Sequence, residues 1–162
     1  MKNIVFLITT LLVIECRGQQ GFSFSYSTNN TLGIDVLARE GNNRLHFGYS
    51  HQFNGQGLNT ENKKKEGFTE TKSGKYFWAC DFGYSRIFFN HLAVHSEVSI
   101  GASKKFANFK DDMGELNDYS LITCRNLAAG IGLKLGYLFK FGFEPFIGIH
   151  TLKKVEFGLR IF

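Results

Sequence analysis

Ionisable side chains of both signs recur on one face of the alternating segments of this sequence. His95 and Glu97 are two residues apart, so on a strand both would lie on one face, where an imidazole base beside a carboxylate could move protons. The other ionisable residues on the same polar face are Asp35, Arg44, His46, Asp81, Lys134, Glu144, His150, Glu156 and Arg160. Such groups, enclosed in a narrow interior, must pair or change protonation. We predict an internal salt-bridge network, with a catalytic or proton-relay site at His95 and Glu97 as the alternative.

Other kinds of chemistry find less support in the sequence. No spacing of Cys and His resembles a metal site, and we predict neither a metal nor a cofactor. Cys80 falls on an apolar face and Cys124 on a polar one, in segments that are not neighbours, so no disulfide between them is expected. The net charge is only +5, with lysines scattered through turns and one loop, which argues against a nucleic-acid partner.

The first 18 residues are typical of a secretory signal peptide. Lys2 supplies the positive start, an apolar run of 11 residues follows at 4–14, and Gly18 is small enough to precede a cleavage site. The run is too short to span a bilayer as a helix. Cys16 raises the alternative of a lipidated cysteine, but Glu15 stands before it where a small residue would be expected. We therefore predict a cleaved signal at 1–18 and one domain at 19–162.

The composition of this domain favours an all-β fold. The 162-residue chain holds 18 Phe and 18 Gly but only 1 Pro. Aromatic residues favour strands, and proline is excluded from the middle of sheets. The mean hydropathy of −0.13 argues against a bundle of membrane helices. A barrel of membrane-spanning strands fits this value, because only half of its strand residues face lipid.

After the predicted signal, apolar and polar residues alternate in short runs between turn residues, with no helical period. Eight runs are predicted as strands: 22–27, 32–37, 44–53, 76–85, 92–101, 126–137, 144–150 and 155–162. The connections after the third and fifth runs, at 54–74 and 110–118, are long and polar. Those after the second, fourth and sixth are short. With the N-terminus on the periplasmic side, both long connections fall on the outer side, as in outer-membrane barrels.

The two faces of the runs also differ in a telling way. The polar face repeats glycine at positions 33, 48, 83, 101, 130, 132, 136, 148 and 158. A soluble lipocalin-like barrel would instead carry long solvated side chains on its polar outer face. Small residues suit a crowded lumen, so we predict that the polar face lies inside and the Phe-, Tyr- and Leu-rich face meets lipid.

The chain ends on a strand-like segment, Val155-Glu156-Phe157-Gly158-Leu159-Arg160-Ile161-Phe162. With the eight runs and the signal, this ending resembles the small eight-stranded outer-membrane proteins, in the broad class of porin-like β-barrel domains. The resemblance implies an antiparallel up-and-down transmembrane β-barrel in the outer membrane of a Gram-negative-type envelope. It also implies that the barrel-assembly machinery reads Phe157, Leu159, Ile161 and Phe162 in the last strand. Phe162 departs from the pattern, because its phase differs from that of the other three.

We therefore expect a barrel with a largely occluded polar lumen and a structural or surface-interaction role, not an enzyme. The expected partners are outer-membrane lipid, lipopolysaccharide, and a surface partner bound through the connections 54–74 and 110–118. The run Lys63-Lys64-Lys65 could contact anionic lipopolysaccharide. Two alternatives stay open: a soluble secreted ligand-binding barrel of lipocalin type, and a lipid-modifying outer-membrane enzyme. Small barrels that modify lipid A use a histidine and a serine, and no distinctive motif of theirs occurs here.

Overall fold

The structure is a computed structural model that describes residues 19–57, 59–61, 63–111 and 118–162. The predictions of a signal peptide at 1–18 and of a lipidated Cys16 lie outside these residues. The described part of the chain contains nine strands: β1 (Gln19–Ser27), β2 (Thr31–Glu40), β3 (Asn43–Gln52), β4 (Thr60–Glu61), β5 (Phe68–Phe88), β6 (Leu92–Asp111), β7 (Tyr119–Tyr137), β8 (Phe143–His150) and β9 (Lys154–Ile161). Within the described residues, no helix has the length and apolar character needed to cross a membrane.

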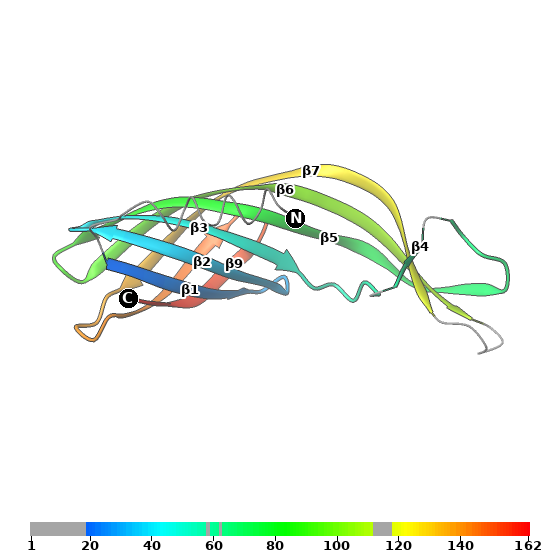
Figure 1. The fold of residues 1–162 in the computed structure, drawn as a ribbon, viewed down its shortest axis with the longest axis horizontal. Helices are drawn as coiled ribbons and strands as arrows, with labels where there is room; N and C mark the ends of the chain where they lie inside the picture. Colours follow the sequence, from blue (N-terminus) through cyan, green and yellow to red (C-terminus); the bar gives the residue numbers. More distant parts are fainter. Residues whose placement is uncertain (1–18, 58, 62, 112–117) are drawn as a thin grey trace.

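Eight of the nine strands close into a barrel (Figure 1). Each pairs antiparallel with its neighbour in the order β1, β2, β3, β5, β6, β7, β8, β9. The ring closes where β9 pairs with β1, with Phe157 opposite Tyr26 and Ile161 opposite Phe22. The prediction of an eight-stranded antiparallel barrel, with the C-terminal strand closing against the first run, is confirmed.

The barrel has a turn end and an extension end. Short turns join β2 to β3, β5 to β6 and β7 to β8 at the turn end, where β1 begins and β9 finishes. Gly41 (φ 58°) and Gly142 (φ 83°) hold the left-handed conformations that two of these turns require. At the extension end, short turns join β1 to β2 and β8 to β9, and the connections predicted at 54–74 and 110–118 lie on this side of the barrel. The predicted asymmetry of short and long connections therefore holds.

The predicted long connection at 54–74 needs correction, because β5 already begins at Phe68. Strands β5, β6 and β7 contain 21, 20 and 19 residues and run well past the barrel, whose other strands have 8 to 10 (Figure 1). The unpredicted β4 adds to them in parallel, with Thr60 opposite Ser120. We call residues 53–76 and 102–125, as far as they are described, the extension. The alternation of apolar and polar residues is weak there, for example at 68–74.

The second predicted connection, 110–118, is shorter in the structure. Lys110 and Asp111 end β6, and Tyr119 begins β7. Residues 112–117 lie outside the described part of the chain.

The barrel wall carries apolar side chains outside and polar side chains inside. Along β6, Val94, Val98 and Ile100 are exposed, whereas His95, Glu97 and Ser99 are buried. The same alternation runs along β7, where Ile131 is 65% and Leu133 is 60% exposed while Lys134 is buried. This polarity is the reverse of that of a water-soluble barrel and matches a transmembrane one.

The extension has an apolar cluster of its own, separate from the barrel. Phe68, Phe109 and Tyr119 form it, with the rings of Phe68 and Tyr119 edge to face at 5.0 Å. The connection before β4 packs across the sheet through side-chain amides. Asn108 Nδ2 donates to the Gly55 carbonyl at 2.7 Å, and Asn54 Nδ2 donates to the Lys75 carbonyl at 2.8 Å. These contacts make the extension a structured part of the molecule.

Candidate functional site

The barrel interior is the candidate site, because the structure places every predicted ionisable residue there. All eleven are buried: Asp35, Arg44, His46, Asp81, His95, Glu97, Lys134, Glu144, His150, Glu156 and Arg160. They come from seven of the eight barrel strands, β2, β3, β5, β6, β7, β8 and β9. Closure of the barrel brings together residues that are up to 125 positions apart in sequence, from Asp35 to Arg160.

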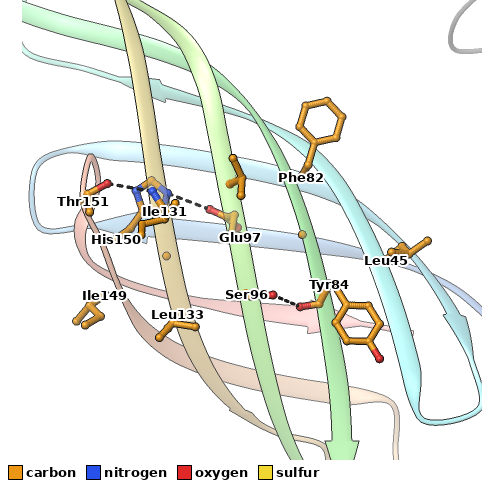
Figure 2. A pocket seen from close by; sticks show the side chains of 13 residues that line it. Leu45, Phe82, Tyr84, Ser96, Glu97, Ile131, Leu133, Ile149, His150 and Thr151 are labelled. Carbon is orange, nitrogen blue, oxygen red and sulfur yellow. Dashed lines mark hydrogen bonds and ion pairs between the residues drawn. The ribbon is translucent and has the colours of Figure 1, made fainter.

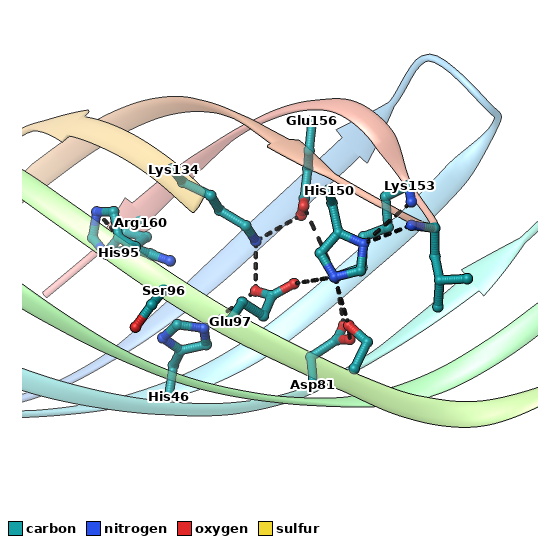
Figure 3. A network of polar contacts seen from close by, with 12 residues as sticks. His46, Asp81, His95, Ser96, Glu97, Lys134, His150, Lys153, Glu156 and Arg160 are labelled. Carbon is teal, nitrogen blue, oxygen red and sulfur yellow. Dashed lines mark hydrogen bonds and ion pairs between the residues drawn. The ribbon is translucent and has the colours of Figure 1, made fainter. Parts of the chain in front are cut away.

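Glu97 is the centre of the first of two groups in this interior (Figure 3). Its carboxylate accepts from Lys134 Nζ at 2.6 Å and lies 3.2 Å from His46 Nε2. Lys134 Nζ also donates to Glu156 at 2.9 Å, so one ammonium joins two carboxylates. These pairs are enclosed by protein, where removal of one member would leave an uncompensated buried charge.

Lys153 belongs to this group although sequence analysis missed it. Its ammonium donates to Glu97 at 2.6 Å and to Asp81 at 2.7 Å, and the side chain is buried. The residue sits in the turn between β8 and β9, where Lys154 takes a left-handed φ of 67° and breaks the alternation that guided the prediction. A charge count would have indicated a missing cation, although it could not have identified Lys153. The eleven predicted residues hold five carboxylates but only three permanent cations, and Lys153 supplies a fourth.

Glu144 is the centre of the second group, nearer the turn end. Its carboxylate pairs with Arg44, with His95 Nε2 at 2.9 Å and with Arg160 Nη1 at 3.3 Å. The buried ring of Phe146, also missed from the sequence, lies 4.7 Å from the guanidinium of Arg160. Phe146 thus supports the cations of this group through a ring face.

The inward glycines make room for these side chains. Gly83 and Gly132 pair across the sheet with Glu97 from either side. A Cβ atom at Gly83 would collide with the His46 ring, and one at Gly132 with the His150 ring. The predicted crowding of the lumen behind the glycines is therefore borne out at these two positions.

The interior also contains two clusters of apolar residues, one near each end of the barrel. Phe77, Ala79 and Ala128 pack with Leu152 at the extension end. Ile87, Ala93 and Leu138 pack with Phe162 at the turn end.

Phe162 itself leaves the strand pattern because its backbone N–H donates to the Gly142 carbonyl at 3.0 Å. Its ring then lies 4.2 Å from the Arg44 guanidinium. The change of phase seen in the sequence is thus the point where the chain leaves the strand pattern and the Phe162 ring contacts Arg44.

The hydrogen bonds bear on the two catalytic alternatives. His95 and Glu97 share a face, but no contact joins them, since His95 pairs with Glu144 and Arg160 while Glu97 pairs with His46 and two lysines. A serine does meet a histidine at Ser99 and His150, 3.0 Å apart. The hydrogen bonds of this second pair run in the wrong direction for His150 to activate Ser99 as a nucleophile.

His150 Nδ1 accepts from the backbone N–H groups of Leu152 and Lys153, at 3.1 and 3.3 Å. The proton of the neutral ring is therefore on Nε2, which donates to Ser99 Oγ, while Ser99 donates to Asp81. A base that activates a serine must face it with a free lone pair. The arrangement holds the three residues in place and leaves Ser99 unactivated.

The remaining candidate ligands do not form a metal site. Among the described residues, no group of three or more His, Cys, Asp or Glu side chains could hold a metal ion. Cys80 and Cys124 are both free thiols.

A second feature lies on the outer face of the wall (Figure 2). A hollow of about 880 Å³ spans β3 to β8, and its apolar lining includes Phe82, Val98, Ile131 and Leu133. Ser96 is a small residue on this outer face, between Tyr84 and Leu133 on the neighbouring strands. Its hydroxyl donates to the Tyr84 carbonyl at 3.3 Å. The hollow is lined mainly by apolar side chains, together with the polar residues Glu97, His150 and Thr151 (Figure 2).

Comparison with known proteins gives likenesses of structure only. No family model and no curated protein sequence matches the chain. The crystal structure of Neisserial surface protein A matches with a TM-score of 0.51 and 12% identity, over 88% of this chain and 92% of that chain. Ail, the attachment invasion locus protein of Yersinia pestis, matches with a TM-score of 0.47 and 8% identity, over 88% and 89% of the two chains. The first likeness shows that the chain has the fold of the small eight-stranded outer-membrane β-barrels.

Proposed function

We propose that this protein is an integral outer-membrane barrel with an occluded lumen, and that it acts in interactions at the cell surface through its extension. One observation carries the proposal: charged side chains from seven of the eight strands are buried inside the barrel, most of them in ion pairs, while the outer face of the wall is mainly apolar. Exposure of these apolar side chains to water would be unfavourable, whereas their contact with the hydrocarbon of a bilayer is favourable.

A closed ring of strands also fits the bilayer. The barrel pairs β9 with β1, so within the wall it leaves no open strand edge to lipid. We propose the outer membrane of a Gram-negative-type envelope as its place, with the turn end in the periplasm. The barrel-assembly machinery is the proposed partner in insertion, reading Phe157, Leu159 and Ile161 on the outer face of β9 together with Phe162.

The packing of the interior argues against general conduction. Side chains fill a lumen of eight strands, and here the polar groups are further covered by the Phe77 cluster at one end and by the Phe162 cluster at the other. A solute crossing this barrel would have to displace both clusters and break buried ion pairs. We therefore propose a plugged barrel that does not act as a pore.

The extension is the part suited to contact with a partner. It carries β5, β6 and β7 beyond the wall and presents nine cations, at Lys63, Lys64, Lys65, Lys72, Lys75, Lys104, Lys105, Lys110 and Arg125. Lipopolysaccharide is the proposed anionic partner at the membrane surface.

Neither alternative function fits as well. The buried Ser99–His150 pair has the wrong hydrogen-bond direction for an acyl-transfer nucleophile, so we propose that the protein is not an enzyme. A soluble lipocalin-like barrel would need the opposite polarity of its two faces.

Fractionation of cells that express the full chain tests the proposal, together with gel mobility before and after boiling. We expect recovery in the outer-membrane fraction, faster migration of the unboiled protein, and tryptic cleavage of intact cells within Lys63–Lys65. Recovery in the detergent-free supernatant would refute the membrane assignment. Protection of Lys63–Lys65 on intact cells, with cleavage only after lysis, would refute the orientation.

A further inference from the structure

Two cations stand side by side where the barrel wall meets the extension. Lys104 of β6 lies directly opposite Arg125 of β7, and Tyr76 of β5 lies opposite Lys104 on its other side. Directly opposed residues of antiparallel strands share a face. Counting in steps of two from Val98 and Ile131, that face is the apolar outer face of the barrel.

We propose that Lys104 and Arg125 form a binding site for the phosphate groups of an anionic glycolipid of the outer leaflet. The inference deepens the proposed function and rests on it, since it assumes that the barrel wall lies in the outer membrane. It assigns the lipid contact to two residues at the barrel rim, in place of the lysine run at 63–65.

The position of Lys104 and Arg125 along the barrel axis supports a lipid headgroup as their ligand. The adjacent rung towards the barrel is Trp78, Ala102 and Leu127, where Leu127 is 79% exposed on the outer face. Two strand residues advance about 7 Å, so both cations stand one short step beyond the apolar band. Lipid phosphates occupy this depth, immediately outside the hydrocarbon.

The charges of the pair call for an anion. Like charges directly opposite each other destabilise a sheet. Among the described residues, neither Lys104 nor Arg125 forms an ion pair with a carboxylate. A phosphate between them would remove the repulsion and accept charge-assisted hydrogen bonds from an ammonium and a planar guanidinium.

Aromatic side chains lie beside the pair, with Tyr76 at its own level and Trp78 and Tyr49 towards the barrel. The Tyr76 ring lies 5.9 Å from Lys104 Nζ, and the rings of Trp78 and Tyr49 stack at 6.4 Å. His51 packs against Tyr76 with ring centres 5.7 Å apart. Aromatic residues of this kind concentrate at the membrane–water interface, so they fix the height at which the cations meet the lipid.

The outer hollow gives the acyl chains of the same lipid a place (Figure 2). It lies on β5, β6 and β7 below the cation pair, with Val98 and Ile131 in its lining. Val98 precedes Lys104 by six residues, about 20 Å along a strand, which a fatty acyl chain can span. The phosphate site and the hollow thus suit the two ends of one amphipathic molecule.

The chain supplies a matched control on the opposite face of the same strands. Lys75 and Lys105 are also directly opposed, one position away from Tyr76 and Lys104. Removing them deletes the same number of charges from the same strands, but from the face turned away from the lipid. The comparison therefore separates a located site from a general effect of net charge.

The test is binding of diphosphorylated lipid A to the purified, detergent-folded barrel, measured by native mass spectrometry. The variants are Lys104→Gln/Arg125→Gln and Lys75→Gln/Lys105→Gln. Dephosphorylated lipid A and inorganic phosphate serve as further probes. Unboiled gel mobility checks that each variant forms the closed barrel.

We expect the Lys104→Gln/Arg125→Gln pair to weaken lipid A binding by about tenfold or more, because it removes two charge-assisted contacts. The Lys75→Gln/Lys105→Gln pair should leave the affinity within about twofold. Dephosphorylated lipid A should bind the unchanged protein as weakly as lipid A binds the first variant. If both variants lose affinity equally, or if neither does, the proposed site at Lys104 and Arg125 is refuted. The proposed function would still stand in that case if the protein shows the heat-modifiable gel mobility of a closed barrel. Displacement of lipid A by inorganic phosphate would identify a site for free anions instead and overturn the lipid assignment.

Discussion

The barrel interior and the extension treat charge in opposite ways. Inside the barrel, Glu97 and Glu144 each hold several cationic or imidazole partners in full burial. In the extension, the ion pair of Lys65 and Glu61 at 2.8 Å leaves its side chains 50% and 43% exposed. Burial makes the interior pairs obligatory, whereas solvent makes the exposed pair optional. The interior pairs therefore hold the barrel together, and the exposed charges of the extension fit its proposed role in binding partners.

The sharpest way to break this contrast is to neutralise one carboxylate in each region. Glu97→Gln would leave Lys134 and Lys153 each short of a buried partner, and we expect a loss of about 3–5 kcal/mol in the free energy of unfolding. Glu61→Gln should cost less than about 1 kcal/mol. Urea unfolding of both variants in lipid vesicles measures the difference. Similar losses for the two variants would contradict the division of roles.

The glycines offer a second comparison between the two regions, which concerns the room for a side chain and not its charge. Gly132→Ala would push a Cβ into the His150 ring, and we expect a loss of about 1–3 kcal/mol in stability. Gly57 of the extension is the control, since its Cβ would make ordinary contact with Ser120 at 3.4–3.5 Å. Gly57→Ala should leave the unfolding midpoint nearly unchanged. An unaffected Gly132→Ala barrel would show that the lumen is less crowded than we infer.

Substitution in the apolar cluster at the turn end is expected to have a smaller effect on stability. Phe162→Ala removes the ring that packs with Leu138 and lies over Arg44, and we expect it to cost about 1–2 kcal/mol. Phe141 at the same end is 86% exposed, so Phe141→Ala serves as its control and should be silent in the same unfolding assay. Equal effects of the two changes would show that the Phe162 ring does not help to close the end of the lumen.

The smallest global effect is expected from the extension cluster. Phe109→Ala removes ring contacts to Phe68 and Tyr119, so local opening should become easier without weakening the barrel. Hydrogen exchange should accelerate at the amides around Phe109 and Tyr119 and stay unchanged at Glu97 and Lys134. Faster exchange throughout the barrel would mean that the two regions unfold as one.

The sequence predicted the barrel well because lipid and a crowded lumen impose strict alternation on its wall. Runs such as 92–101 and the closing strand from Val155 to Ile161 carry that pattern, so eight strands, their parity and the eleven interior residues could be read from it. The extension has water on its surfaces, and residues 68–74 alternate too weakly to indicate a strand. β4 has only two residues and no pattern at all.

Within the site, the sequence did not predict two residues, Lys153 and Phe146. Lys153 reaches the interior because the chain reverses at Lys154 with a left-handed backbone, which no two-residue period anticipates. Phe146 was overlooked because it is an aromatic residue on a face read as polar, where it supports Arg160 through its ring. Pairings such as Lys153 with Asp81 depend on the closed barrel, and sequence alone could not supply them.

The central claim is that the outer face of the wall meets lipid while the extension meets water. A nitroxide on a single cysteine at Leu133 or at Lys105, with Cys16, Cys80 and Cys124 replaced by serine, tests it in reconstituted vesicles. The label at Leu133 should collide mainly with oxygen, which concentrates in hydrocarbon, and the label at Lys105 mainly with a water-soluble nickel complex. Equal access of the nickel complex to both positions would contradict the membrane-embedded barrel.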